Sequence, residues 1–372
     1  MAFAGHQLPD FPWDSLVPFR ERAARHPGGT CDLSIGTPVD PVPVLVQQAL
    51  SEAANSPGYP TTHGTTALRE SIAGWFDRRL GVPNLDPTAV LPTIGSKEFI
   101  AWLPTLLGLG STNTVVTPQV AYPTYDVGAQ LAGCRVMRAD SLTALGPSTP
   151  ALLWLNSPAN PTGRVLGVEH LRKVVSWARQ RGVTVASDEC YIELGWDEQP
   201  MSILHPDVCD GSFDGLLSVQ SLSKRSNLAG YRFGYVAGDP MLIAGLLEVR
   251  KHAGMMVPAP IAQAATAALC DDGHVVAQRS TYRARRELLI AGLTEAGFRI
   301  DDSVAGLYLW ATRDESCWDT VGWLADRGIV VAPGDFYGPA GKSHVRVAIT
   351  ATDDRVQEAV RRLAIAEPES SV

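Results

Sequence analysis

The sequence has no run of basic residues, no long apolar stretch and no cysteine pattern of a known kind. Its formal net charge is −8, which argues against a nucleic-acid or anionic-membrane partner. The first ten residues lack the basic and apolar regions of a secretory signal, and no apolar run approaches the length that spans a bilayer. We therefore expect a soluble, cytoplasmic protein.

The cysteines are scattered, with no C-x-x-C pair and no histidine at ligand spacing. They are Cys31, Cys134, Cys190, Cys209, Cys270 and Cys317. We interpret them as reduced thiols, and we expect neither a disulfide framework nor a metal site. The length of 372 residues favours two domains, and 45% hydrophobic with 19% charged residues is typical of a globular protein.

A lysine-centred stretch carries the strongest chemical signal. From Ser221 it reads Ser-Leu-Ser-Lys-Arg-Ser-Asn-Leu-Ala-Gly-Tyr-Arg-Phe-Gly-Tyr, with Lys224 behind two hydroxyl residues. A lysine amine can condense with an aldehyde, and pyridoxal phosphate is a ligand that bears both an aldehyde and an anion. Ser221, Ser223 and the forked guanidinium of Arg232 would then bind its phosphate. The alternative is a polar surface loop that contains glycine.

A second candidate phosphate contact follows a predicted strand. Residues 90–98 read Val-Leu-Pro-Thr-Ile-Gly-Ser-Lys-Glu, which predicts a strand, a glycine turn and a helix from about Ser96. Unpaired amides and the positive end of the helix dipole favour an anion at such a turn. Ser96 and Lys97 are therefore predicted to contact the phosphate, chiefly through backbone amides. The same turn is common in α/β proteins.

Two further predicted strands end in polar residues. One runs from Leu152 into Asn156-Ser-Pro-Ala-Asn160-Pro-Thr-Gly, and the other ends at Asp188-Glu-Cys-Tyr191. Ligands bind at the carboxyl ends of strands in open α/β sheets, so we expect these residues near Lys224. A carboxylate there can keep a pyridine nitrogen protonated and the ring an electron sink.

Taken in their order along the chain, these elements resemble the fold-type I, class I/II aminotransferase family over nearly the whole sequence. The resemblance implies that Lys224 binds the pyridoxal phosphate and moves protons, and that Asp188 faces the pyridine nitrogen. It implies that Asn160 and Tyr191 share the cofactor's phenolic oxygen. It also implies that Tyr125, two residues after a proline, stacks on the cofactor ring.

The resemblance further implies a substrate pocket and a homodimer. Gly36, in Ile-Gly-Thr-Pro, would present its amide to the substrate carboxylate beside Asn160, because a side chain there would obstruct a ligand. Arg346, on a predicted strand, would bind that carboxylate; by itself it could also extend from an edge strand. Tyr59, in Y-x-x-x-x-G-x-x-x-L-R, would reach the cofactor phosphate of the other subunit.

Several stretches are similar to a narrower group, the actinobacterial N-succinyldiaminopimelate aminotransferases. They are residues 11–14, 33–43, 94–98, 221–234 and 333–338. This similarity implies ping-pong transfer of the amino group of glutamate to N-succinyl-2-amino-6-oxopimelate, on the succinylase route to meso-diaminopimelate and lysine. Arg250, Lys251 and Lys97 are candidate partners for the distal carboxylates, although no motif selects among them and a solvated charge is the more ordinary role for each.

Alternatives remain on the same scaffold. They are an aminotransferase for LL-diaminopimelate, aspartate or aromatic substrates, and a carbon–sulfur β-lyase. A ligand-sensing regulator and a non-catalytic scaffold are different classes of protein, and a scaffold would be expected to lose Lys224 or Asp188, which are both present.

The implied fold is α/β. It comprises a large domain, with a mostly parallel seven-stranded sheet between helices, and a small α+β domain built from the N- and C-terminal segments. We place the N-terminal segment at residues 1–40, the large domain at 41–280 and the small domain at 281–372. The hydrophobic pattern predicts helices over residues 16–25, 44–54, 68–80, 96–107, 168–181, 241–251, 261–269, 274–296 and 320–327.

Overall fold

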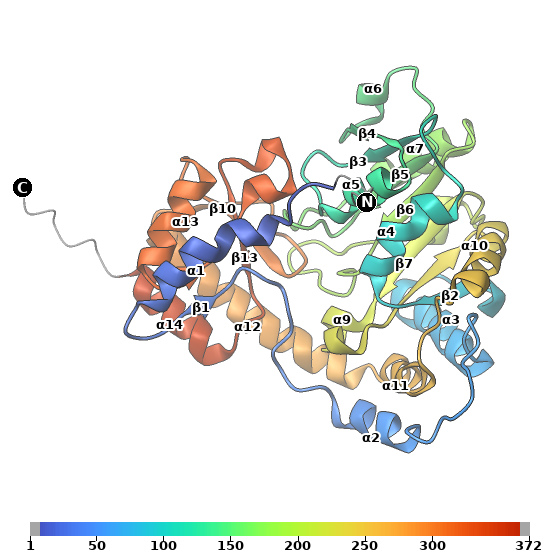
Figure 1. Cartoon of the computed structure of the whole chain (residues 1–372), viewed down its shortest axis with the longest axis horizontal. Coiled ribbons are helices and arrows are strands. Elements are labelled where there is room, and N and C mark those ends of the chain that lie inside the picture. The colour runs from blue at the N-terminus through green and yellow to red at the C-terminus, as the bar shows by residue number, and fades with distance from the viewer. Residues whose placement is uncertain (1–7, 365–372) are drawn as a thin grey trace, which may run out of the picture.

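The computed structural model describes residues 8–364 and has two lobes. The larger lobe contains the middle of the chain, and the smaller lobe combines the N-terminal helix with about the last quarter of the sequence (Figure 1). Within the described residues, no helix has the length and apolar character needed to cross a membrane.

A seven-stranded sheet forms the centre of the large lobe, in the order β2-β8-β7-β6-β5-β3-β4. Only β8 runs antiparallel to its neighbours. The strands are β2 (Val90–Thr93), β3 (Thr114–Thr117), β4 (Arg135–Arg138), β5 (Leu152–Asn156), β6 (Thr184–Asp188), β7 (Leu216–Ser221) and β8 (Gly234–Gly238). The predicted mostly parallel sheet is confirmed.

Helices cover both faces of this sheet, which explains why its central strands are apolar along their whole length. One core joins the sheet to α3, α7 and α11, and another joins it to α4, α5 and α10. The helices are α2 (Val44–Glu52), α3 (Thr66–Leu80), α4 (Ser96–Leu106), α5 (Thr124–Leu131), α6 (Leu142–Leu145), α7 (Val168–Arg179), α8 (Pro206–Cys209), α9 (Leu222–Arg225), α10 (Pro240–Ala253) and α11 (Ala259–Cys270).

The small lobe is built around the four-stranded sheet β12-β13-β10-β9 and the parallel pair β1-β11. Because β1 pairs with β11, the N-terminal segment lies beside the C-terminal part of the chain. The elements are α1 (Val17–Ala24), β1 (Cys31–Asp32), β9 (Arg299–Asp301), β10 (Tyr308–Thr312), α13 (Cys317–Asp326), β11 (Ile329–Val330), β12 (Ala332–Pro333), β13 (Val345–Ala348) and α14 (Asp353–Leu363).

One long helix, α12 (Gly273–Glu295), runs through both lobes (Figure 1). Its Arg285 is almost fully buried and pairs with Asp40, at 2.6 Å, and with Asp353, also at 2.6 Å. Gln278 of the same helix donates to Asp40 and accepts from Asn227, both at 2.8 Å. The predicted domain boundary at residue 280 therefore falls inside a continuous helix, and the division stays a prediction.

Candidate active site

Lys224 lies on α9, a short helical turn that directly follows β7. The turn begins at Ser221, whose Oγ accepts a hydrogen bond of 3.1 Å from the amide of Ser223. The partly buried Lys224 amine donates to the carbonyl oxygen of Gly36, 188 residues away in the sequence. The predicted cofactor lysine therefore meets the predicted carboxylate loop.

Strand register brings the predicted phosphate contacts to one edge of the sheet. Gly234 of β8 lies opposite Thr93 of β2 on one side and opposite Ser221 of β7 on the other. A Cβ added to Gly234 would lie 2.8 Å from the amide nitrogen of Ser96, where α4 begins. Only glycine therefore permits this approach between the helix end and the strand.

Arg232 lies against the same helix end. Gly95, the N-cap of α4, has a φ of 77°, and an added Cβ would come within 2.6 Å of Nη2 of Arg232. Nη1 of Arg232 donates to the carbonyl of Ala229 at 2.8 Å. The site thus combines free helix amides with a guanidinium, which is the combination that favours a phosphate.

Asp188 ends β6 as a buried carboxylate. Its Oδ2 accepts a hydrogen bond of 2.8 Å from the hydroxyl of Tyr125, and its Oδ1 accepts one of 3.2 Å from the amide of Cys190. Burial raises the pKa of Asp188, although the two donors act in the opposite direction. No ion pair to Asp188 occurs within residues 8–364. A protonated ring nitrogen would stabilise this carboxylate.

The rings around Asp188 differ from the prediction. Tyr125 has no exposed surface, and its ring stacks on Trp154 with centroids 5.0 Å apart. A ring that stacks on a cofactor needs a free face, so Tyr125 does not fit the predicted stacking role. Tyr122, which contacts the Tyr125 ring edge-on at 5.9 Å, retains exposed surface. The Tyr125 hydroxyl instead contacts the carboxylate of Asp188.

Arg346 lies on β13 and is 3% exposed. Its Nη1 donates to Oδ1 of Asn160 at 2.9 Å and its Nη2 to the carbonyl of Ser34 at 2.7 Å, while its buried Nε has no hydrogen-bond partner. The amide of Asn160 in turn donates to Asn156 at 2.7 Å. Arg346 and Asn160, both predicted to bind substrate, are thus in contact.

Tyr308 is a site residue that the sequence analysis missed. Its ring lies 3.9 Å from Cζ of Arg346, and its hydroxyl lies 3.2 Å from that of Tyr191. A Cβ on Gly36 would come within 2.3 Å of the same hydroxyl. The pairing of β10 with β13 sets Trp310 opposite Arg346 and Tyr308 opposite Ala348, so Tyr308 lies diagonally across from Arg346, and no local sequence pattern signals this contact.

Other predicted residues lie outside this contact network. The side chain of Lys97 is exposed and its amine lies 5.9 Å from the ring of Phe11, so only its backbone belongs to the helix end. Arg250 is fully buried and pairs with Glu98 at 2.8 Å, and Lys251 pairs with Glu248. Neither is a suitable partner for a distal substrate carboxylate.

Comparison with known proteins decides the family. The model of "Aminotransferase class I and II" matches residues 30–363. The chain belongs to this family. It is 64% identical to "Probable aminotransferase Rv1178" of Mycobacterium tuberculosis, over 96% of this chain and 85% of that protein.

Two further proteins illustrate the range of relatives. The chain is 57% identical to the 4-dedimethylamino-4-oxo-anhydrotetracycline transaminase OxyQ of Streptomyces rimosus, over 96% of this chain and 99% of that protein. A solved structure of a "probable N-succinyldiaminopimelate aminotransferase" of Thermus thermophilus superposes with a TM-score of 0.86. It shares 29% identity and covers 95% of this chain and 99% of the other.

The protein is a fold-type I aminotransferase that depends on pyridoxal phosphate, and its site suits that cofactor. The α4 end with Arg232 suits a phosphate, Asp188 suits a protonated nitrogen, and the Lys224 amine suits an aldehyde. Within the described residues, no group of three histidine, cysteine, aspartate or glutamate side chains could hold a metal ion.

Proposed function

We propose that the protein transfers the amino group of glutamate to N-succinyl-2-amino-6-oxopimelate, in the succinylase branch of diaminopimelate and lysine synthesis. The Arg346–Asn160 contact supports the binding of a substrate α-carboxylate, because a buried guanidinium suits a carboxylate. The similarity to the Thermus aminotransferase supports the rest. Lys97 remains a candidate for a distal carboxylate, since its exposed amine carries no ion pair within residues 8–364.

The roles of the other residues follow from their contacts. The cofactor, when bound, supplies an aldehyde and an electron-withdrawing ring. Lys224 would carry the proton between the substrate carbon and the cofactor, and the Gly36 carbonyl holds its amine in the pocket. Asp188 would hold the ring nitrogen protonated, while Asn160 and Tyr191 would face the phenolic oxygen.

Two site assignments belong to this proposal. Tyr122 replaces Tyr125 as the stacking ring, since it has the free surface that Tyr125 lacks. Tyr59 would complete the site of a second subunit. Its side chain is 97% exposed, as expected of a residue whose partner lies outside its own chain.

A second candidate function rests on the similarity to OxyQ. That relative is named as a transaminase of a polycyclic ketone and is 57% identical to this chain. A bulky ketone acceptor is therefore the alternative to a dicarboxylic keto acid.

One panel of substrates separates the two candidate functions. The purified holoenzyme is assayed in reverse for 2-oxoglutarate-dependent consumption of N-succinyl-LL-diaminopimelate, LL-diaminopimelate and aspartate. In the forward direction, glutamate consumption is followed with the tetracyclic ketone. The proposal expects the succinylated substrate to have the highest kcat/KM. Preference for the ketone would support the alternative, and preference for LL-diaminopimelate or aspartate would contradict both.

A further inference from the structure

A second cavity lies between the two lobes, beyond the carboxyl ends of β3 and β5. Its volume is about 480 Å³ and it is partly open to solvent. Most of its wall is apolar, and includes Leu142, Leu145, Leu153, Leu155 and Trp310. Ligand pockets of a few hundred Å³ with apolar walls are typical of small-molecule sites.

This cavity is separate from the active site. Lys224, Asp188, Asn160 and Arg346 do not line it. The residue between the two is Asn156, which lines the cavity and whose side chain accepts from the Asn160 amide at 2.7 Å. Its Nδ2 also donates to the carbonyl of Asp188 at 2.9 Å. A ligand in the cavity would therefore lie next to a support of the active site.

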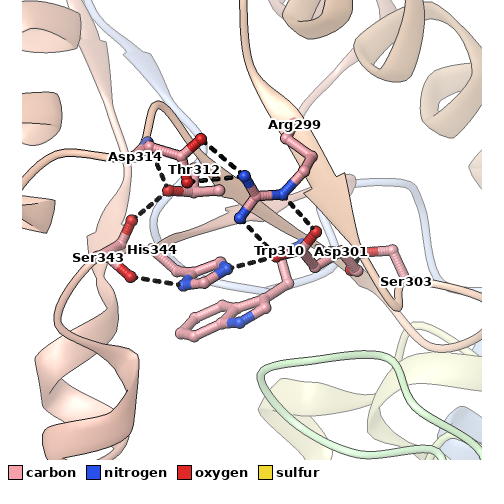
Figure 2. Close-up of polar contacts among 8 residues, drawn as sticks. All are labelled: Arg299, Asp301, Ser303, Trp310, Thr312, Asp314, Ser343 and His344. Atoms are coloured by element: carbon pink, nitrogen blue, oxygen red, sulfur yellow. Dashed lines mark hydrogen bonds and ion pairs between the residues drawn. The ribbon is translucent and has the colours of Figure 1, made fainter.

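The small-lobe wall of the cavity is held in place by a polar cluster (Figure 2). Trp310 stacks on His344, with ring centroids 4.9 Å apart and planes within 3°. His344 contacts Asp301 at 2.8 Å, and the Trp310 amide donates to Ser303 at 2.9 Å. Arg299 fixes Asp301 from the other side at 2.9 Å. Trp310 thus presents a fixed aromatic surface to the cavity.

Three charged side chains line the cavity: Asp140, Arg164 and Asp302. Oδ1 of Asp140 accepts from the amide of Gln119 at 2.9 Å, and the oppositely charged Arg164 and Asp302 lie on neighbouring turns. Arg164 and Asp302 are both exposed. The turns are joined, because the amide of Ser303 donates to the carbonyl of Thr162 at 2.8 Å. Among the described residues, neither charged side chain forms an ion pair, with the other or with a third group. Both charges are free to bind a ligand.

We propose that this cavity binds an α-amino acid with a large apolar side chain. The ligand's carboxylate would pair with Arg164 and its ammonium with Asp302, because a zwitterionic head group offers an anion to one and a cation to the other. Its side chain would lie among the leucines and against Trp310, where burial of apolar surface is favourable. Through Asn156, occupancy would alter the position of Asn160 and so the binding of the substrate carboxylate.

The test uses holoenzyme reduced with borohydride, which fixes the cofactor on Lys224 and blocks exchange with a free amino acid. Titration calorimetry with L-phenylalanine is expected to show one saturable site per chain. 3-Phenylpropionate, which lacks the ammonium, should bind about tenfold more weakly, since one charge-assisted hydrogen bond is lost. Asp302→Asn should remove this difference.

Two further variants locate the site. Arg164→Gln should weaken both probes about tenfold, for the same reason. Leu145→Trp should abolish binding by filling the cavity. Arg172→Gln, which removes an exposed arginine of α7 that does not line the cavity, is the matched control and should bind like the wild type. No saturable binding, or binding unchanged in both Arg164→Gln and Leu145→Trp, would overturn the proposal.

A separate measurement tests whether binding in the cavity affects the active site. Saturating L-phenylalanine should change the visible circular dichroism of the unreduced cofactor in wild-type protein but not in Leu145→Trp. An equal change in both would place the effect at the active site and overturn the coupling. These readouts do not depend on which keto acid the enzyme accepts.

Discussion

The hydroxyl of Tyr125 donates a 2.8 Å hydrogen bond to the carboxylate of Asp188, and both side chains are buried. Burial raises the pKa of Asp188, and this hydrogen bond lowers it. The bond therefore helps to keep Asp188 ionised for the ring nitrogen. The role differs from the ring stacking expected of Tyr125, and it can be tested by removing one oxygen atom.

Tyr125→Phe should reduce kcat about tenfold, because a hydrogen bond to a charged group contributes about 1.5 kcal/mol or more. Loss of the donor raises the pKa of Asp188 further, so the acid limb of the kcat profile should move to higher pH. Steady-state kinetics across pH measures both effects. Tyr235→Phe, which alters a buried tyrosine of β8 that does not contact Asp188, is the control. An unchanged acid limb in Tyr125→Phe would contradict this role.

Lys224→Ala should abolish turnover, because no other amine occupies its position beside the Gly36 carbonyl within the described residues. The variant should still bind the cofactor without a covalent bond, so that borohydride followed by denaturation releases it. Absorbance of the protein before and after gel filtration measures this. Turnover near that of the wild type would remove Lys224 from the mechanism.

Gly36→Ala should raise KM for the keto acid more than it lowers kcat. The added Cβ would lie 2.3 Å from the Tyr308 hydroxyl, and the displaced ring contacts Arg346. We expect at least a tenfold increase in KM, which corresponds to about 1.4 kcal/mol. Gly110→Ala is the matched control, since a Cβ there meets nothing within 4 Å. Equal kinetics in the two variants would show that the carboxylate pocket lies elsewhere.

Glu189→Gln should change how stability depends on pH. Glu189 is fully buried, and burial raises its pKa from 4.5 to about 7. Between these values the unfolded chain has lost the proton that the folded chain retains, so stability falls as pH rises. The raised pKa of Glu189 therefore costs about 3 kcal/mol of stability across this pH range, at about 1.36 kcal/mol for each pH unit.

Urea denaturation of the apoprotein at pH 4.5 and pH 8 measures how the contribution of Glu189 to stability changes with pH. The stability of Glu189→Gln relative to wild type should be more favourable at pH 8 than at pH 4.5. Glu70→Gln, at an exposed position of α3, should show no such change. Parallel pH dependence of wild type and Glu189→Gln would mean that folding does not raise the pKa of Glu189.

If Tyr59 completes the site of a second subunit as proposed, Tyr59→Phe should weaken cofactor binding about tenfold without changing the oligomeric state, since only one hydrogen bond would be lost. Sedimentation establishes the oligomeric state, and fluorescence titration of apoprotein measures the cofactor affinity. A fully active monomer would contradict the contribution of Tyr59 to a second subunit.

The sequence predicted the elements that carry the cofactor because their signals are local. Strand ends at Asp188 and Asn156, and the helix start at Ser96, follow from apolar runs and turn residues. Helix α14 was missed, although its apolar residues repeat with helical spacing. Helix α5 was also missed, and with it the direction of the Tyr125 ring.

Contacts between distant segments could not be predicted in this way. Arg250 was a candidate substrate ligand, yet it pairs with Glu98, 152 residues away. Tyr308 reaches the site only because β10 pairs with β13. Such contacts depend on the packing of the two lobes, for which no local pattern exists in the sequence.

The course of α12 limits how this protein can be divided. Its early turns pack beside α9, its later turns pack on α14, and Arg285 pairs with residues from both ends of the chain. A fragment cut at residue 280 would leave each lobe with only part of α12, and would leave Asp40 and Arg285 on separate chains. We infer that the lobes fold as one cooperative unit, so limited proteolysis should not release a stable small domain.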